Sequence, residues 1–192
     1  ERMRKSLGLD KGFVFGIVCR VAATKFVLEF VRAAALVAKQ RPDCMFLVVG
    51  DERDGDYVHH VRQTVDTGLL RDRFVMAGHR EDIADVLNSI DVLVTLAGGS
   101  IMYEAMACGV PVLSAGFTKR SDSVHVVHDR TGVVLETRAP EEVAAAMIRL
   151  MDDAAYRKRL KEEALRHAEE HLIDKAMAEK TQQFYERILA NR

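Results

Sequence analysis

The residues whose types and spacing best suit ligand chemistry are Gly98, Gly99, Ser100 and Glu104. They follow an apolar run, residues 92–96, that is short and rich in β-branched side chains, as a buried parallel strand would be. Ser100 is a favoured N-cap residue, so we expect the glycine pair to connect this strand to a helix. Glycines let a ligand approach the backbone, and free N–H groups at a helix N-terminus attract anions. The pattern predicts a phosphate-binding turn at 98–100.

Glu104 lies four residues after Ser100 and therefore on the same face of the predicted helix. Helical side chains lean toward the N-terminus, so we expect its carboxylate to point to the same turn. A carboxylate repels phosphates but accepts hydrogen bonds from hydroxyls, such as the two of a ribose. Taken alone, the residues are equally compatible with a tight turn and a glutamate that complements the helix dipole.

Charged side chains also follow the first three predicted strands. Arg20 and Lys25 come after the first strand, Asp51 after the second, and His79 and Arg80 after the third. The carboxyl ends of parallel strands meet at one edge of a sheet, where ligands of such sheets bind. Two cations and a helix N-terminus there would form a diphosphate site. For Arg20 and Lys25, an ordinary solvated charge on a loop is an equally good interpretation. For His79 and Arg80, an ordinary polar turn is the more favoured interpretation.

The elements that must position these residues alternate along the chain. Short apolar runs predict strands, and most are followed by a segment with helical periodicity. The predicted strands are residues 13–19, 44–49, 74–77, 92–96, 112–114 and 133–135, and the last predicted helix covers 174–190. This alternation predicts an α/β fold with a doubly wound, Rossmann-like parallel sheet. No linker or repeat divides the chain, so we expect one domain over residues 1–192.

The composition excludes several classes of function. The 192 residues are 48% hydrophobic, with a net charge of −1 and charges of both signs interspersed, which argues against nucleic acid and membrane surfaces as partners. The cysteines are Cys19, Cys44 and Cys108, widely spaced in apolar contexts, as in a reducing cytoplasm. The histidines lack metal-ligand spacing, so we predict no metal site. Dinucleotide and Walker A glycine motifs are missing from the sequence.

These motifs resemble the carboxyl-terminal, donor-binding domain of GT-B glycosyltransferases, in particular the retaining group 1 (family 4) enzymes. The matching positions run along the whole chain. They are Cys19-Arg20 with Lys25, Val49-Gly50-Asp51, Gly78-His79-Arg80, the run Glu-Ala-Met-Ala-Cys-Gly-Val-Pro-Val over 104–112, and Thr131-Gly132. The resemblance implies transfer of a sugar, with retention, from a nucleotide-diphosphate donor and without a bound metal or other cofactor.

The resemblance also implies roles for the individual residues. Arg20 and Lys25 would hold the diphosphate and act in catalysis, and Gly98, Gly99 and Ser100 would offer N–H groups to it and to the sugar. Glu104 would bind the ribose. The region of His79 and Arg80 would frame the base, and Asp51 belongs with the donor-binding residues at the same edge.

Three features depart from the family pattern. Leu96 stands where the family has the first of two glutamates, Leu96-Ala97-Gly98-Gly99 replaces the usual Glu-Gly-Phe-Gly, and Phe26 stands where the family has a glycine after the lysine. The nucleotide half of the site is kept, whereas the sugar half differs, so the donor or the activity is expected to differ. A nucleotide-sugar 2-epimerase-like GT-B enzyme and a non-catalytic interaction domain are the alternatives.

The chain does not begin with methionine and opens within a helical pattern, which indicates a piece of a longer protein. The resemblance implies that the missing part is an amino-terminal acceptor domain. This chain alone is therefore expected to bind nucleotide but not to transfer sugar, and any peripheral membrane contact would come from the missing domain.

Overall fold

The computed structural model describes residues 2–9, 12–66, 68–116 and 126–172, together with residues 182 and 186. The helices are α1 (Arg2–Ser6), η1 (Ala23–Lys25), α2 (Val27–Gln40), α3 (Gly55–Val65), η2 (Gly68–Leu70), α4 (Ile83–Leu87), α5 (Ile101–Ala107), α6 (Pro140–Asp152) and α7 (Ala154–His171). The strands are β1 (Phe13–Val18), β2 (Cys44–Val49), β3 (Phe74–Met76), β4 (Val92–Thr95), β5 (Val112–Ala115) and β6 (Gly132–Leu135). The predicted helix over 174–190 lies outside the described ranges.

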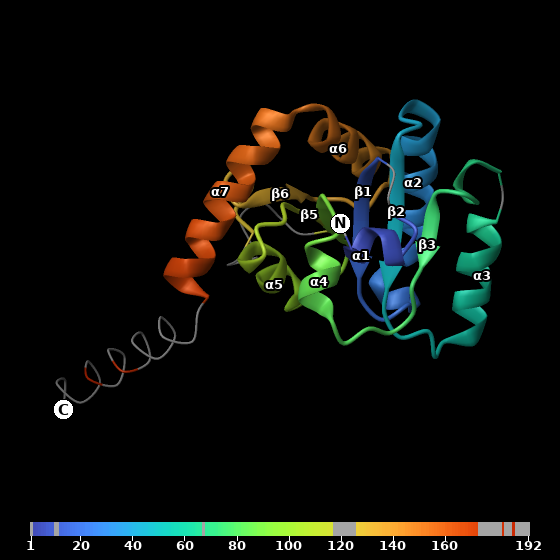
Figure 1. The fold of residues 1–192 in the computed structure, drawn as a ribbon, viewed down its shortest axis with the longest axis horizontal. Helices are drawn as coiled ribbons and strands as arrows, with labels where there is room; N and C mark the ends of the chain where they lie inside the picture. The colour runs from blue at the N-terminus through green and yellow to red at the C-terminus, as the bar shows by residue number, and fades with distance from the viewer. Residues whose placement is uncertain are drawn as a thin grey trace.

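All six strands form one parallel sheet in the order β3-β2-β1-β4-β5-β6, as Figure 1 shows. The neighbours β1 and β4 are far apart in the sequence, and the strand order reverses between them. This is the topological switch point of a doubly wound sheet, where ligands of such sheets bind at the carboxyl ends of the strands. The predicted Rossmann-like α/β fold is confirmed.

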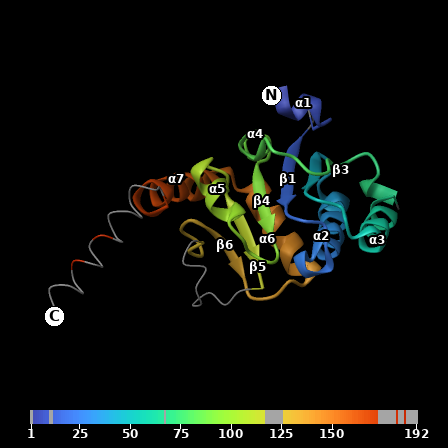
Figure 2. The same cartoon turned by 90° about the horizontal axis from the view of Figure 1, so that it is seen from below.

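Helices cover both faces of the sheet, which Figure 2 shows from a second direction. Side chains alternate along each strand, so Phe15 and Phe46 face one layer while Val14 and Leu47 face the other. The first layer contains α2, α3 and α6, the second contains α4 and α5, and α7 contributes its first half to the first layer and its second half to the second. Both faces are therefore apolar, which explains why the strands are continuous apolar runs rather than alternating ones.

The apolar periodicity of α2 fixes its orientation on the sheet. Its buried residues include Phe30, Val31 and Ala34, spaced as one helical face requires. The ring centroid of Phe30 lies 6.3 Å from that of Phe46 on β2 and 6.0 Å from that of Phe74 on β3. These aromatic contacts pack α2 against β2 and β3.

Candidate functional site

Three backbone hydrogen bonds continue beyond the strand ends and hold the first candidate residues together. The Cys19 N–H donates to the carbonyl of Val49 (2.9 Å), and the Val21 N–H donates to that of Asp51 (2.8 Å). The Gly50 N–H donates to the carbonyl of Gly78 (2.8 Å). As a result, Arg20, Asp51 and His79 follow one another across the carboxyl edge of β1, β2 and β3.

Gly50 is required for this arrangement. A β-carbon at position 50 would overlap the carbonyl oxygen of Cys19, so the backbones at the ends of β1 and β2 approach more closely than any side chain allows. At the end of β2, Gly50 therefore makes a turn and also lets the backbone approach that of Cys19 at the end of β1.

The topological switch point, which is called the crevice below, lies between the ends of β1 and β4. After β1 the chain passes through η1 into α2 on one face of the sheet, and after β4 it passes through residues 98–100 into α5 on the other. Lys25 at the end of η1 and the turn at 98–100 are therefore placed on the two sides of the crevice. The strand order therefore places Arg20, Lys25 and the turn at 98–100 at the same edge of the sheet.

The turn at 98–100 offers unbonded backbone donors. The N–H groups of Gly98, Gly99 and Ser100 donate to no other residue that the structure describes. Gly98 and Gly99 have φ values of 66° and 126°, a region that favours glycine, and the space beside the Gly99 α-carbon is open. A ligand can therefore approach the backbone at Gly99 without displacing any side chain that the structure describes.

Ser100 stands at the predicted N-cap position of α5, but its hydroxyl caps no N–H group. Its φ and ψ of −61° and −26° are already helical, whereas a capping side chain needs an extended backbone. The Met102 and Tyr103 N–H groups donate to the carbonyls of Gly99 and Ser100, whereas the Ser100 hydroxyl and the Ile101 N–H donate to no other described residue. Because α5 has only seven residues, these individual donors matter more here than the helix dipole.

Arg20 and Lys25 are cations whose side chains have no partner in the part of the chain that the structure describes. Arg20 is exposed and Lys25 is half-buried, and neither forms an ion pair or side-chain hydrogen bond with another described residue. Burial raises the pKa of the adjacent Cys19 thiol to about 11, and the Lys25 charge opposes that rise. This opposition shows that the Lys25 charge acts on the end of β1, beside Arg20.

The charges of Asp51 and Arg80 are already paired locally. The Asp51 carboxylate lies 2.7 Å from the Arg53 guanidinium, and the Arg80 guanidinium donates to both carboxylate oxygens of Asp82, at 2.7 and 2.5 Å. The Arg80 hydrogen bond holds the pKa of Asp82 below its usual range. His79 is exposed beside them. Of the predicted cations, Arg80 is therefore the one with the least available charge.

Glu104 is exposed, and its carboxylate forms no hydrogen bond or ion pair with the rest of the described chain. It belongs to the outer face of α5, where Tyr103 and Ala107 join it in lining a groove of about 320 Å³ against Leu165 of α7 and Leu172 directly after that helix. Its charge adds to the burial that raises the pKa of Cys108, four residues later. The carboxylate is accessible to hydroxyl donors near the turn.

Leu96 and Phe26 differ from each other in how the fold uses them. Leu96 is 1% exposed and packs into the core layer that contains α2 and α6. Phe26 is half-buried, and its φ of 58° lies in the left-handed region that favours glycine. Both positions adjoin the crevice, one on the β4 side and one on the β1 side.

Arg138, which follows β6, is the residue at this edge that the sequence analysis missed. Its Nε donates to the carbonyl of Leu96 at 2.5 Å, and its guanidinium carbon lies 4.2 Å from the ring centroid of Phe26. Its Nη2 lies 3.5 Å from the carbonyl oxygen of Gly116. These contacts depend on the order of the strands, so no local sequence pattern could have identified them.

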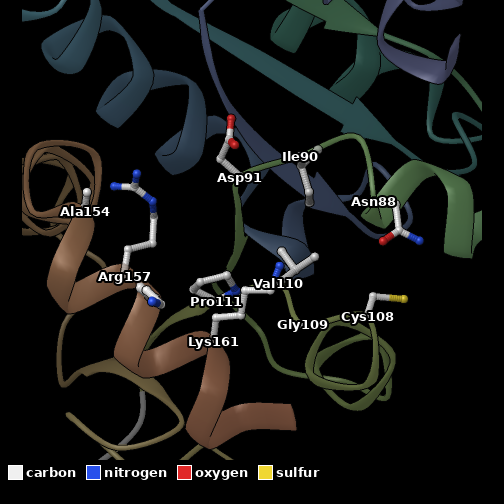
Figure 3. A pocket seen from close by; sticks show the side chains of 11 residues that line it. Asn88, Ile90, Asp91, Cys108, Gly109, Val110, Pro111, Ala154, Arg157 and Lys161 are labelled. Carbon is white, nitrogen blue, oxygen red and sulfur yellow. The ribbon is translucent and has the colours of Figure 1, made fainter. Parts of the chain in front are cut away.

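A pocket of about 290 Å³ lies at the opposite, amino edge of the sheet, as Figure 3 shows. Asp91 and Pro111 line it from the segments before β4 and β5, and Arg157 and Lys161 project toward it from α7. The Arg157 guanidinium already donates to carbonyls at the end of α6, and Asp91 pairs with Arg4. None of the predicted site residues lines this pocket.

The three cysteines are free. Within the described ranges, no three His, Cys, Asp or Glu side chains gather as a metal site would require. In the same part of the chain, no helix has the length and hydropathy needed to cross a membrane.

Comparison with characterised proteins gives relatives that are longer than this chain. The 2-deoxystreptamine glucosyltransferase of Streptomyces kanamyceticus is 34% identical over 164 residues, which cover 81% of this chain and 41% of that protein. The chain thus spans about two fifths of the length of this relative.

Solved structures share the fold. HepE of Anabaena, crystallised in complex with UDP-glucose, has a TM-score of 0.81 and 24% identity, covering 95% of this chain and 52% of that one. The C-terminal domain of the glycosyl transferase group 1 protein LpcC from Francisella tularensis has a TM-score of 0.74 and 23% identity, covering 85% of this chain and 86% of that one.

The family model described as glycosyl transferases group 1 matches residues 1–167, which is most of the chain. Together with a doubly wound sheet of the kind found in the GT-B neighbours, this match shows that the chain belongs to the group 1 glycosyltransferases.

Proposed function

We propose that this chain is the donor-binding domain of a glycosyltransferase that transfers a sugar, with retention, from a nucleotide-diphosphate donor. The observation behind this proposal is the pairing of unpartnered cations with unbonded backbone donors across the switch point. Arg20 and Lys25 stand on the β1 side, and the N–H groups of residues 98–100 stand on the β4 side. A diphosphate is the ligand chemistry that needs both.

In this proposal Arg20 and Lys25 act in catalysis as well as in binding. When the sugar leaves, negative charge develops on the departing diphosphate, and fixed cations and N–H donors stabilise it without a metal ion. Lys25 is half-buried, so less water screens its charge than screens that of Arg20. We therefore expect Lys25 to contribute the larger effect.

The remaining residues would recognise the nucleoside and the sugar. The exposed Glu104 carboxylate is free to accept hydrogen bonds from ribose hydroxyls. Because the Arg80 charge is paired with Asp82, we propose that His79 and Arg80 frame the base through their backbone. Asp51, paired with Arg53, would shape this side of the site rather than contact the donor directly.

The domain organisation is part of the proposal. The matched part of this chain covers only 41% of the characterised relative, so we propose an additional amino-terminal domain that binds the acceptor and closes the other side of the crevice. Sugar transfer would then require both domains, in the cytoplasm and without a metal cofactor. The crystallisation of HepE with UDP-glucose supports a nucleotide sugar as the donor.

A non-catalytic nucleotide-binding domain is the second candidate, favoured by one observation. The Leu96 side chain is buried in the core, so this position supplies no carboxylate to a donor sugar. Turnover of nucleotide sugar by the longer protein would distinguish the candidates, since a non-catalytic domain gives none.

The proposal is tested by isothermal titration of this chain with UDP, GDP and ADP. We expect one of the three to bind, and we expect Lys25→Ala and Glu104→Ala each to weaken binding by about 10-fold or more, the loss of one charge-assisted hydrogen bond. The matched controls are Lys39→Ala and Glu141→Ala, which remove exposed charges of the same sign from α2 and α6. Equal losses in the controls, or no binding by the folded parent chain, would contradict the proposal.

A further inference from the structure

We propose that Arg138 is a positioning residue of the diphosphate site, holding the turn that carries the free N–H groups in register with the segment that carries Lys25. This inference rests on the proposed function and adds a residue to it. Arg138 lies after β6, beyond every motif that we used to identify the site.

One guanidinium joins both sides of the crevice. On the β4 side, Arg138 Nε donates to the carbonyl of Leu96, two residues before the first of the free amides, at 2.5 Å. On the β1 side, the guanidinium carbon stands 4.2 Å from the ring centroid of Phe26, the residue directly after Lys25. The two sides are therefore connected through a single side chain.

The contact with Phe26 acts at the point that sets the direction of Lys25. Phe26 ends η1 and begins α2, and its backbone is left-handed, with φ at 58°. Phenylalanine adopts this conformation only where its surroundings hold it, because its β-carbon crowds the carbonyl. The guanidinium covering its ring is one such restraint, so we expect it to limit the positions available to Lys25.

Arginine is suited to this role in a way that lysine is not. Its planar group can stack on a ring while its N–H bonds donate to carbonyls at the edge of the plane. Arg138 is half-buried, and no described carboxylate lies within ion-pair distance of it. The side chain is therefore held by Leu96, Phe26 and Gly116 rather than by an opposite charge.

Gly116 provides the space for this side chain. A β-carbon at position 116 would overlap the Arg138 guanidinium, and the glycine φ of 82° is also unfavourable for other residues. The ends of β4, β5 and β6 thus all contribute to one contact around Arg138.

The test compares Arg138→Met with Arg149→Met in this chain. Arg149 on α6 stacks on Tyr156 at 4.1 Å from the ring centroid, so its removal costs a similar stacking contact away from the crevice. Titrations use UDP, GDP and ADP and, for the one that binds most tightly, the matching nucleoside monophosphate. We expect Arg138→Met to weaken diphosphate binding about 10-fold while changing monophosphate binding much less, and Arg149→Met to change neither.

The ratio of diphosphate to monophosphate affinity is the decisive measurement, because general loss of stability would weaken both ligands together. Arg138→Lys separates positioning from charge. A lysine keeps the charge, but it cannot stack on the Phe26 ring and donate to the Leu96 carbonyl at the same time. We therefore expect it to restore little of the ratio of diphosphate to monophosphate affinity. Full restoration would show that only the charge matters and would overturn the inference.

Phe26→Leu tests the same contact from the other side and serves if Arg138→Met does not fold. It removes the aromatic face but keeps an apolar side chain, and we expect the same fall in the affinity ratio. An unchanged ratio in a folded variant overturns the positioning role while the proposed function stands. Failure of the parent chain to bind any of the three nucleotides overturns both.

Discussion

The two edges of the sheet differ in how their charged side chains are used. At the amino edge, Arg4 lies 2.7 Å from the Asp91 carboxylate, which also accepts from the Val14 N–H at 2.7 Å. At the carboxyl edge, Arg20, Lys25 and Glu104 have no partner among the described residues. The first set connects parts of the fold, whereas the second is available to a ligand.

The contrast extends to the strand connections. Before β6, the Tyr156 hydroxyl donates to Asp129, and His128 Nδ1 accepts from the Val134 N–H at 3.0 Å. After β4, the three N–H groups of residues 98–100 donate to no other residue within the described ranges. Polar groups that stabilise a fold and polar groups that bind ligands can thus be distinguished by their partners, even where their residue types are the same.

The largest expected effect comes from a substitution that disrupts the carboxyl edge of the sheet. Gly50→Ala forces apart the ends of β1 and β2, and we expect it to lower the free energy of unfolding by about 4 kcal/mol, the range of severe backbone overlaps. Nucleotide binding should fail with it. Urea denaturation measures the loss, and Gly55→Ala, at an unhindered helix start, should change stability by less than about 0.5 kcal/mol. Equal effects would show that the close approach is not required.

The next prediction tests whether the amino edge of the sheet contributes to stability but not to nucleotide binding. Arg4→Met removes a partly buried ion pair and the hydrogen bond to the Ser89 carbonyl, so we expect a loss of about 2 kcal/mol in unfolding free energy. Nucleotide affinity should stay unchanged because the site is at the other edge. Arg62→Met breaks a more exposed pair with Glu52 and should cost about 0.5 kcal/mol. A loss of nucleotide affinity in Arg4→Met would contradict the separation.

The smallest expected effect detects the Lys25 charge through the pKa of the neighbouring Cys19 thiol. Burial raises the pKa of both Cys19 and Cys44 to about 11, but only Cys19 is opposed by Lys25. Lys25→Met should therefore raise the Cys19 pKa further and slow its alkylation at pH 8, because less thiolate is present. Mass spectrometry of the alkylated peptides gives each rate, and Cys44 serves as the internal control. A rate for Cys19 that falls no more than that for Cys44 would place the Lys25 charge elsewhere.

The sequence predicts the sheet well because its strands are short, apolar on both faces and bounded by glycine, proline or charged residues. The second strand is found with both predicted ends, Cys44–Val49. The helical segment between the third and fourth predicted strands is short: α4 covers only Ile83–Leu87, and Arg80 and Asp82 pair in the turn before it. Apolar periodicity places such a helix but does not show where local side-chain pairing delays its start.

The candidate site is predictable in its positions and less so in its chemistry. Glycine turns and strand ends give residues 98–100, Arg20 and Lys25, because parallel topology brings strand ends together. Which charges remain free depends on turn conformation, and Asp51 and Arg80 prove to be paired. Arg138 depends on the adjacency of three strand ends, which only the assembled sheet defines.

The adjacency of β1 and β4 has a consequence for cooperativity. The Val14–Asp91 hydrogen bond joins residues 77 apart in the sequence, so the sheet consists of two contiguous halves that meet along one seam. The crevice opens on that seam. A ligand bound across this seam stabilises only the state in which the two halves are packed together. Ligand binding should therefore slow hydrogen exchange of the amides along β1 and β4 more than of those on the outer strands β3 and β6.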